Sequence, residues 1–252
     1  MRSPWILETP TRKPGRCRLL CFPYAGGGAS LFTGWSANLG PAAEVLPIQL
    51  PGRENRLREP PFTNVNALVG SLLQSIRQQL YGPWAVFGHS FGGLLAYETA
   101  RAAVRDGYQQ PQAVFVSACR PPDVETRFAH TLHTMGDDEL IAELQELGEA
   151  PMAALNDPEL RRLFIPTIRA DVELCETYQF VPDDVLEAPI VALSGADDPH
   201  ADAVEMKRWA EFTHGPFVQE VVDGGHFFLR SNQESLLQHL KEHLEAPPAG
   251  VH

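Results

Sequence analysis

Hydrophobic and polar positions follow two patterns along the chain, and segments with the two patterns alternate. Six short apolar runs have the length and composition of β-strands: RLLCFP, EVLPIQLP, WAVFGH, AVFVSAC, PIVALSG and FVQEVVDGG. Segments whose apolar residues recur every three or four positions predict helices over residues 63–80, 92–107, 203–212 and 232–246. This alternation of strands and helices indicates an α/β fold with a mostly parallel central sheet flanked by helices.

The alternation is interrupted once, by a long segment at residues 120–188. Its sequence is helical in pattern, notably in GDDELIAELQELG and DPELRRLFIPTIRADVELCETYQF. Because one helix is enough to connect two parallel strands, we interpret this segment as an insertion and expect a helical lid over the open end of the sheet. Residues 1–252 are otherwise expected to form a single domain, since the length suits one hydrophobic core.

Charge and composition argue against several classes of function. The formal net charge of −12 leaves no basic face for a phosphate backbone, so no nucleic-acid partner is expected. No apolar stretch approaches the ~20 residues that a membrane span needs, and we therefore expect a cytoplasmic protein without membrane association. The four cysteines include no C-x-x-C pair, which favours reduced, buried thiols over disulfides or metal ligands.

A local basic cluster survives in this acidic chain, within the sequence LPGRENRLREP. Its members, Arg53, Arg56 and Arg58, lie close together along the chain. They belong either to a salt-bridged loop or to a binding site for an anionic group. Internal salt bridges are the interpretation that we favour.

The sequence around Ser90 carries the most specific chemical signal. A hydrophobic strand runs without a polar loop into a helix, and the junction Gly88-His89-Ser90-Phe91-Gly92 has the pattern G-x-S-x-G. In this context the pattern predicts a nucleophile elbow, in which a strained backbone exposes the serine hydroxyl at the carboxyl end of the sheet. Ser90 is therefore the candidate nucleophile.

A serine hydroxyl is a weak nucleophile, so it needs a base and a carboxylate that orients the base. With this elbow the order along the chain is serine, acid, histidine. His226, in the glycine-bordered turn VVDGGHFFLR, is the candidate base. The position three residues after Gly195 favours Asp198 as the acid, with Asp197 as the alternative. His89 is expected to be a packing residue.

Acyl transfer through a serine also needs N–H donors for the oxyanion of the intermediate. Phe91 follows the nucleophile, and its backbone N–H is the first expected donor. The loop CFPYAGGGAS is expected to supply the second, because its run from Ala25 to Gly28 lets backbone N–H groups face a ligand without side chains in the way. A phosphate-binding loop does not fit, since Leu31 stands where G-x-G-x-x-G requires its third glycine.

Taken together, the motifs resemble those of the type II thioesterases that accompany nonribosomal peptide and polyketide synthases, a family within the α/β-hydrolases. The likeness runs nearly from end to end, through CFPYAGGGAS, LPGRENRLREPPF, FGHSFGGLLAYE, SACRPP, SGADDP and DGGHFF, in the order of the family. The second motif discriminates, because generic esterases share the elbow without it. The family often has methionine after the nucleophile, where this chain has Phe91. The acyl pocket is therefore expected to differ.

The resemblance implies an α/β-hydrolase fold and an editing thioesterase. Such an enzyme hydrolyses the thioester between an acyl group and the phosphopantetheine arm of an acyl or peptidyl carrier protein, and so clears misprimed or stalled chains. Ser90 would attack the carbonyl, His226 would carry the proton to the departing thiol, and Asp198 would hold the ring. The N–H groups of Ala25 and Phe91 would bind the oxyanion. No metal or cofactor is implied, and a monomer is expected.

The insertion at residues 120–188 would be the mobile lid of that family. We expect it to select the acyl group and to contribute no catalytic group. The candidates for lining the acyl chamber are Leu140, Leu144, Leu147, Leu163 and Phe164.

Other functions fit the same motifs. A medium-chain acyl-carrier-protein thioesterase that controls product length would show a sharp optimum of chain length. An acyltransferase of the same fold would deliver the acyl group to an amine or alcohol. A protein that only binds carrier proteins would not need the complete set of Ser90, Asp198 and His226, which makes this alternative the weakest.

Overall fold

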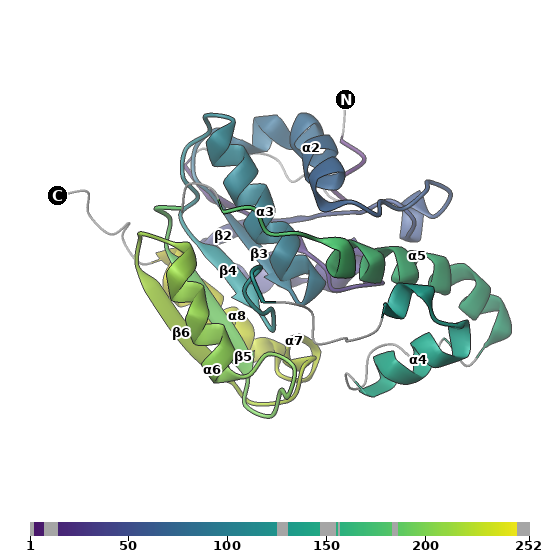
Figure 1. Ribbon diagram of the computed structural model, residues 1–252. Helices are drawn as coiled ribbons and strands as arrows, with labels where there is room; N and C mark the ends of the chain where they lie inside the picture. The colour runs from purple at the N-terminus through teal and green to yellow at the C-terminus, as the bar shows by residue number, and fades with distance from the viewer. Residues whose placement is uncertain are drawn as a thin grey trace.

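All neighbouring strands of the central sheet are parallel in the computed structural model, which describes residues 3–7, 15–124, 131–146, 155, 157–182 and 186–245. The strand order is β2-β1-β3-β4-β5-β6 (Figure 1). The strands are β1 (Cys17–Phe22), β2 (Ala43–Pro47), β3 (Trp84–His89), β4 (Val114–Ser117), β5 (Ile190–Gly195) and β6 (Phe217–Val222). Each of the apolar runs recognised in the sequence overlaps one of them, so the predicted parallel sheet is confirmed.

The strand order reverses once, and the reversal positions the site. After β1 the chain moves outward to β2, and it then returns to place β3 on the other side of β1. From β3 onward the strands continue in the opposite direction, to β6 at the far edge. In open α/β sheets the carboxyl ends of the strands at such a reversal border a crevice that binds ligands. Here those ends lead into the glycine loop after β1 and into Ser90 after β3.

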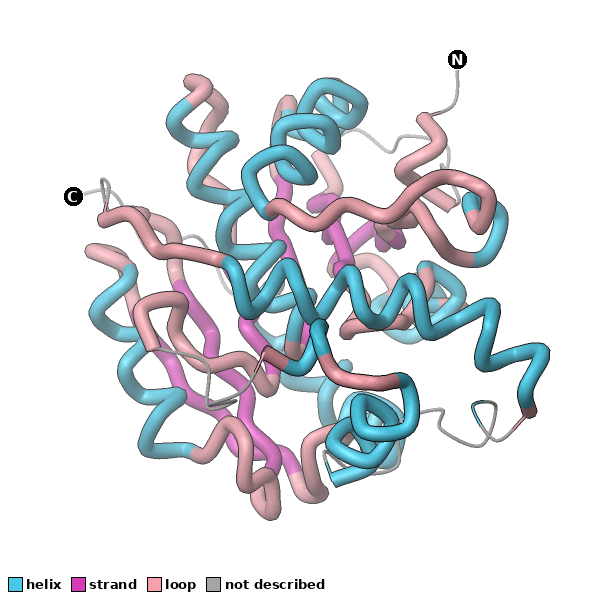
Figure 2. The backbone as a smooth tube through the Cα atoms, turned by 45° about the vertical axis from the view of Figure 1, so that its right-hand side comes forward, coloured by secondary structure: helices cyan, strands magenta, loops and turns pink. Residues whose placement is uncertain are grey.

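Helices cover both faces of the sheet, as Figures 1 and 2 show. One face packs against α2 (Val65–Ile76), α3 (Phe91–Arg105) and α6 (Ala203–Lys207). The other face packs against α1 (Trp35–Leu39), α7 (Phe228–Ser231) and α8 (Gln233–Glu245). The short helices α1 and α7 were not predicted. Both have fewer than six residues, too few for a helical period to emerge from the sequence.

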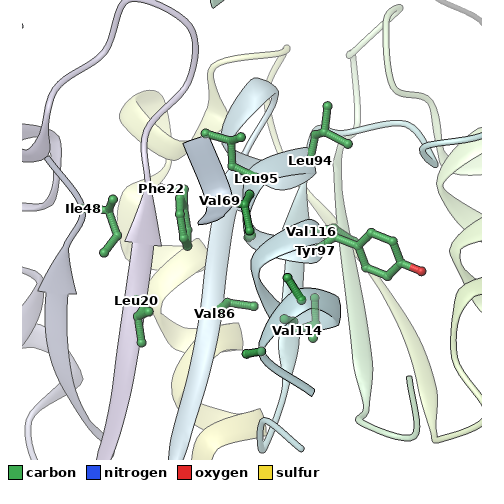
Figure 3. Packing of buried hydrophobic residues seen from close by; sticks show 14 of the residues in the cluster. Leu20, Phe22, Ile48, Val69, Val86, Leu94, Leu95, Tyr97, Val114 and Val116 are labelled. Carbon is green, nitrogen blue, oxygen red and sulfur yellow. The ribbon is translucent and has the colours of Figure 1, made fainter. Parts of the chain in front are cut away.

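The side chains of strand β1 contribute to two hydrophobic cores, one on each face of the sheet. Leu20 and Phe22 belong to the cluster under α2 and α3, whereas Leu19 and Cys21 belong to the cluster under α8. Successive side chains of a strand point to opposite faces, and all four residues are fully buried. Figure 3 shows Leu20 and Phe22 with labelled residues of α2 and α3 on the same side of the sheet. A strand buried on both faces reads as a continuous apolar run, as the sequence did.

Between β4 and β5 lie the helices α4 (Asp137–Glu146) and α5 (Pro158–Thr177). They project together from one end of the sheet (Figures 1 and 2) and form small clusters of their own, in which Leu140 and Leu144 pack with Val172. Both helices fall where the sequence predicted helical structure. The chain also contains short 3-10 helices at Ala29–Phe32, Glu54–Arg56, Arg77–Leu80, Leu132–Thr134 and Arg208–Phe212. Within the described residues, no helix combines the length and the apolar character that crossing a membrane would require.

Candidate active site

Ser90 occupies a strained turn between β3 and α3. Its backbone has φ 54° and ψ −122°, in a region that residues other than glycine rarely adopt. The Ser90 N–H donates to the Ser117 carbonyl at 2.7 Å, which ties the turn to β4. A Cβ atom at Gly88 would lie 1.9 Å from the Gly92 carbonyl oxygen, and one at Gly92 would lie 2.3 Å from the Phe22 oxygen. Strand and helix therefore approach too closely for any side chain at these two glycines.

Three of the predicted side chains meet in one line of hydrogen bonds. His226, in the turn after β6, has Nε2 at 3.0 Å from Ser90 Oγ and Nδ1 at 2.9 Å from Asp198 Oδ2. An ionised carboxylate can only accept, so Nδ1 carries the ring proton in the neutral imidazole. Nε2 is then free to accept from the Ser90 hydroxyl. This arrangement is the one in which an imidazole activates a serine as a nucleophile.

Asp198 lies in the loop after β5, where its carboxylate is almost completely buried. Besides the bond to His226, its Oδ1 accepts from the backbone N–H groups of His200 at 2.8 Å and Ala201 at 3.3 Å. Burial alone would raise the pKa of Asp198, but the interaction with His226 and the two N–H donors outweigh it and lower the pKa. Asp197 is exposed. Of the two aspartates that the sequence left open, Asp198 is the one that contacts His226.

His89 does more than the predicted packing. Its ring is fully buried, with Nδ1 at 2.9 Å from Ser117 Oγ and Nε2 at 2.8 Å from the carbonyl oxygen of His226. Burial, with a smaller contribution from His226, lowers the pKa of His89 to about 3, so the ring is neutral near pH 7. Nε2–H must donate to the carbonyl, which leaves Nδ1 to accept from Ser117. The residue before Ser90 thus holds the backbone of His226, whose ring contacts the Ser90 hydroxyl.

The two expected oxyanion donors follow neighbouring strands. Phe91 is the first residue of α3, where a backbone N–H has no acceptor within the helix. Ala25 lies in the loop after β1, inside a turn closed by a hydrogen bond of 2.9 Å from Gly27 N to the Tyr24 carbonyl. Because β1 and β3 are neighbouring parallel strands, both N–H groups lie at the carboxyl ends of the strands.

A pocket of about 200 Å³ opens beside Ser90. Its wall is formed by the start of α3, the segment after β4, the end of α5 and the ring of His200. Most of the side chains are apolar or weakly polar, among them Leu94, Cys119, Cys175 and Tyr178. Such a lining suits an acyl chain next to a serine nucleophile.

Comparison with known proteins decides the family. The sequence model of the thioesterase domain matches residues 17–244, which is most of the chain. The chain belongs to the thioesterase family. It is accordingly a hydrolase that acts on thioesters.

Individual relatives of this thioesterase are similar over nearly their whole length. The gramicidin S biosynthesis protein GrsT of Aneurinibacillus migulanus is 34% identical over 240 residues, covering 95% of this chain and 93% of GrsT. The structure of the type II thioesterase BorB from the borrelidin biosynthetic cluster superposes with a TM-score of 0.83 at 36% identity, over 96% of this chain and 97% of BorB. RedJ, a thioesterase of the prodiginine pathway in Streptomyces coelicolor, has a TM-score of 0.83 at 34% identity, over 93% and 91% of the two chains. These likenesses confirm the predicted α/β-hydrolase fold.

None of the described residues predicted to line the acyl chamber borders this pocket of the thioesterase. The residues of the insertion that line the pocket are Arg120 to Pro122, Val124, Cys175 and Tyr178. Leu140 and Leu144 are buried between the helices of the insertion, and Leu163 is exposed. Phe164 packs against Ile165 and its neighbours, and Leu147 lies outside the described residues. The helical period identified the apolar face of each helix, but not which partner covers that face.

Two of the three clustered arginines are ion-paired within the thioesterase. Arg53 is buried against Asp171 of α5, and Arg56 pairs with Glu59 at 2.6 Å. Arg58 is exposed. The interpretation as a salt-bridged loop is therefore confirmed for Arg53 and Arg56.

The cysteines of the thioesterase are free thiols, as predicted: Cys17, Cys21 and Cys119 are buried, and Cys175 is half-buried. Burial raises the pKa of the Cys119 thiol to about 12, so it is protonated near pH 7. The described part of the chain contains no group of three or more His, Cys, Asp or Glu side chains that could hold a metal ion.

Proposed function

We propose that this thioesterase is an editing enzyme of a nonribosomal peptide or polyketide synthase. Its substrates would be acyl thioesters on the phosphopantetheine arm of acyl or peptidyl carrier proteins, and it would remove aberrant or stalled acyl groups. The support is the similarity to GrsT, BorB and RedJ, whose names place them in the biosynthesis of gramicidin S, borrelidin and prodiginine. The observation that carries the proposal is the hydrogen-bonded line from Asp198 through His226 to Ser90, beside an apolar pocket.

In the proposed mechanism Ser90 Oγ attacks the thioester carbonyl while His226 Nε2 takes its proton. The C–S bond breaks as the tetrahedral intermediate collapses, and His226 gives the proton to the departing thiolate. Water then attacks the acyl-serine with the same base, which releases the carboxylic acid and restores Ser90. Asp198 keeps the proton on Nδ1 and stabilises the imidazolium.

The developing negative charge needs donors that are already in place. We assign this role to the backbone N–H groups of Phe91 and Ala25, one from the helix start after β3 and one from the glycine loop after β1. Neither group depends on a side chain. A substitution at either position would therefore act through the shape of the turn.

Replacement of the nucleophile tests the chemistry. We expect Ser90→Ala to fold normally and to lose ~10³-fold or more of the turnover, because a member of the triad is missing. Hydrolysis of acetyl, hexanoyl and decanoyl carrier proteins should be followed together with labelling by a fluorophosphonate probe. A folded Ser90→Ala protein that keeps more than a tenth of the wild-type turnover would show that Ser90 is not the nucleophile.

The same substrate panel tests the editing role. Broad, slow hydrolysis with a preference for short acyl groups supports editing, whereas a sharp optimum at medium chains would support control of product length. Transfer of the acyl group to an added amine or alcohol would indicate an acyltransferase. We further expect a cytoplasmic monomer, for which size-exclusion chromatography with light scattering is the direct measurement of oligomeric state.

A further inference from the structure

The helix α5 is bonded to the loop that contains Ala25. Oδ2 of Asp171, on α5, accepts a hydrogen bond of 2.7 Å from the backbone N–H of Gly26. Asp171 is 1% exposed, so the carboxylate that accepts this bond is buried. A side chain of the inserted segment thus contacts the backbone next to an assigned oxyanion donor.

A second residue, Arg53, completes the contact from the loop after β2. Its guanidinium pairs with both carboxylate oxygens of Asp171, Nη1 at 2.7 Å from Oδ2 and Nη2 at 2.8 Å from Oδ1. Nη1 also donates to the Gly27 carbonyl at 3.1 Å. Arg53 is 4% exposed. The planar guanidinium therefore links α5 and the glycine loop in one buried network.

Two further contacts hold the same face of α5 against these loops. Thr167, one helical turn before Asp171, donates from Oγ1 to the Gly52 carbonyl at 2.5 Å. Ile168 packs so closely on the glycine loop that a Cβ at Gly26 would lie 2.6 Å from its Cγ1. Any residue other than glycine at position 26 would force Ile168 or the loop to shift.

The bond to Asp171 bears directly on the conformation of the turn. Tyr24 to Gly27 form a four-residue turn, in which Gly26 occupies the third position with φ +74°. This value is that of a type II turn, which differs from type I by a flip of the central peptide. The central peptide here joins Ala25 to Gly26, and its N–H donates the hydrogen bond to Asp171. Asp171 therefore favours one of the two orientations of this peptide.

We propose that Asp171 and Arg53 are positioning residues for the oxyanion hole. Through them, the geometry of the hole depends on the packing of α5 against the glycine loop. The inference rests on the proposed function, since it assumes that the Ala25 N–H binds the oxyanion. The inserted segment then contributes to catalysis as well as to the shape of the pocket. Displacement of α5 from the glycine loop disorders the oxyanion donor while Ser90, His226 and Asp198 stay in contact.

The test compares two double variants that lack the ion pair equally. Removing one partner alone would leave a buried charge unpaired, whereas replacing both with uncharged residues is far better tolerated. Arg53→Met with Asp171→Leu removes the acceptor for Gly26 N–H. Arg53→Met with Asp171→Asn retains a carbonyl oxygen at that position. Asp138→Asn is the matched control, because it breaks an exposed ion pair between α4 and Arg161 of α5.

The substrate for this test is a small acyl thioester of N-acetylcysteamine, which needs no carrier protein. In the leucine double variant we expect kcat to fall ~10²-fold with KM within about twofold, as when an oxyanion donor is lost. Affinity for a trifluoromethyl ketone, which forms a tetrahedral adduct with a serine, should fall by a similar factor. The asparagine double variant should recover most of both losses, and Asp138→Asn should change neither.

Two results would overturn the proposal: a folded leucine double variant with wild-type kcat and inhibitor affinity, or equal losses in the two double variants. If the variants do not fold, amide hydrogen exchange of the wild-type protein, measured by NMR, tests the proposal instead. Gly26 N–H should then exchange no faster than the backbone N–H groups of residues 167–171, and clearly faster exchange contradicts the coupling. A wild-type enzyme that hydrolyses the small thioester but not the thioester of any acyl-carrier protein would contradict only the editing role.

Discussion

The surroundings of Ser90 and the outer part of the insertion are held together by different interactions. Around Ser90 the contacts are buried hydrogen bonds between residues distant in sequence, such as those of His226 with Asp198 and of His89 with the His226 carbonyl. In the outer part, α4 meets α5 through small apolar clusters and through exposed ion pairs such as Asp138 with Arg161. Buried polar contacts fix geometry strongly, whereas exposed ion pairs contribute little.

The boundary between these two regions runs through α5 rather than at its ends. Pro166 lies inside the helix, where it removes a backbone hydrogen bond. Before it most residues are exposed, and after it Thr167, Ala170 and Asp171 are buried. One face of the second half of α5, with Thr167 and Asp171, thus contacts the loops at the site, whereas Val172 and Arg169 in the same half contact α4. Four substitutions test this division, taken from the largest expected effect to the smallest.

The largest effect is expected at the acid of the site. Asp198→Asn should lower kcat/KM by up to ~10⁴-fold, because an amide cannot hold the His226 tautomer or stabilise its positive charge. Asp197→Asn is the matched control and should stay close to wild type, since Asp197 is exposed. Steady-state kinetics on one acyl-carrier protein compares the two. Equal losses would mean that the contact seen for Asp198 has no catalytic meaning.

The second substitution tests the buried polar contacts themselves. His89→Leu leaves the His226 carbonyl and the Ser117 hydroxyl without their partner, which should lower the free energy of unfolding by ~1–3 kcal/mol for each group left unsatisfied. Urea denaturation at pH 7 measures the loss. If stability is unchanged, the two hydrogen bonds of His89 are not important for the fold.

His89 also predicts how stability depends on pH. Its pKa is about 3 in the folded protein and 6.5 as the ordinary value, so only the unfolded chain takes up this proton between the two. Stability should therefore decrease as pH falls from about 6.5 towards 3. The same titration on His89→Leu should have a shallower slope in this window. An identical slope in both proteins would assign the acid sensitivity to other groups.

The third substitution concerns the choice of acyl group. Cys175 lines the pocket from the second half of α5, so Cys175→Leu should disfavour decanoyl relative to acetyl substrates by roughly 10-fold, the scale of a few methylene-sized contacts. Leu144→Ala is the comparison from the outer region. It should loosen the cluster of α4 and speed local amide exchange, while scaling all acyl rates by one factor. A larger change of preference in Leu144→Ala would reverse the assignment of the lining.

The smallest effect is expected where the outer region is held by an exposed ion pair. Asp137→Asn breaks the contact with Arg169, and its cost in unfolding free energy should lie within ~0–1 kcal/mol. Thermal unfolding at low and high salt measures it. A loss as large as that of His89→Leu would show that the insertion is held as firmly as the site.

Much of this protein could be predicted locally. The strands were visible because a parallel strand buried on both faces is a continuous apolar run, and the elbow because no side chain fits at Gly88 or Gly92. Asn64 caps α2 by accepting from Ala67 N, a bond between residues three positions apart. Signals of this kind act within one turn or one strand, so they are present in the sequence itself.

The sequence by itself determined the α/β class, the tight strand-to-helix turn at Ser90 and the presence of a helical insertion, because each follows from the period or the size of neighbouring residues. The sequence favoured Asp198 over Asp197, but only the tertiary structure shows which of them contacts His226 and which side of the insertion lines the pocket. It also brought Arg53 to Asp171, 118 positions away along the chain. Such contacts depend on strand order and on how one helix is seated against two loops, and no residue pattern in either partner specifies the distance between them.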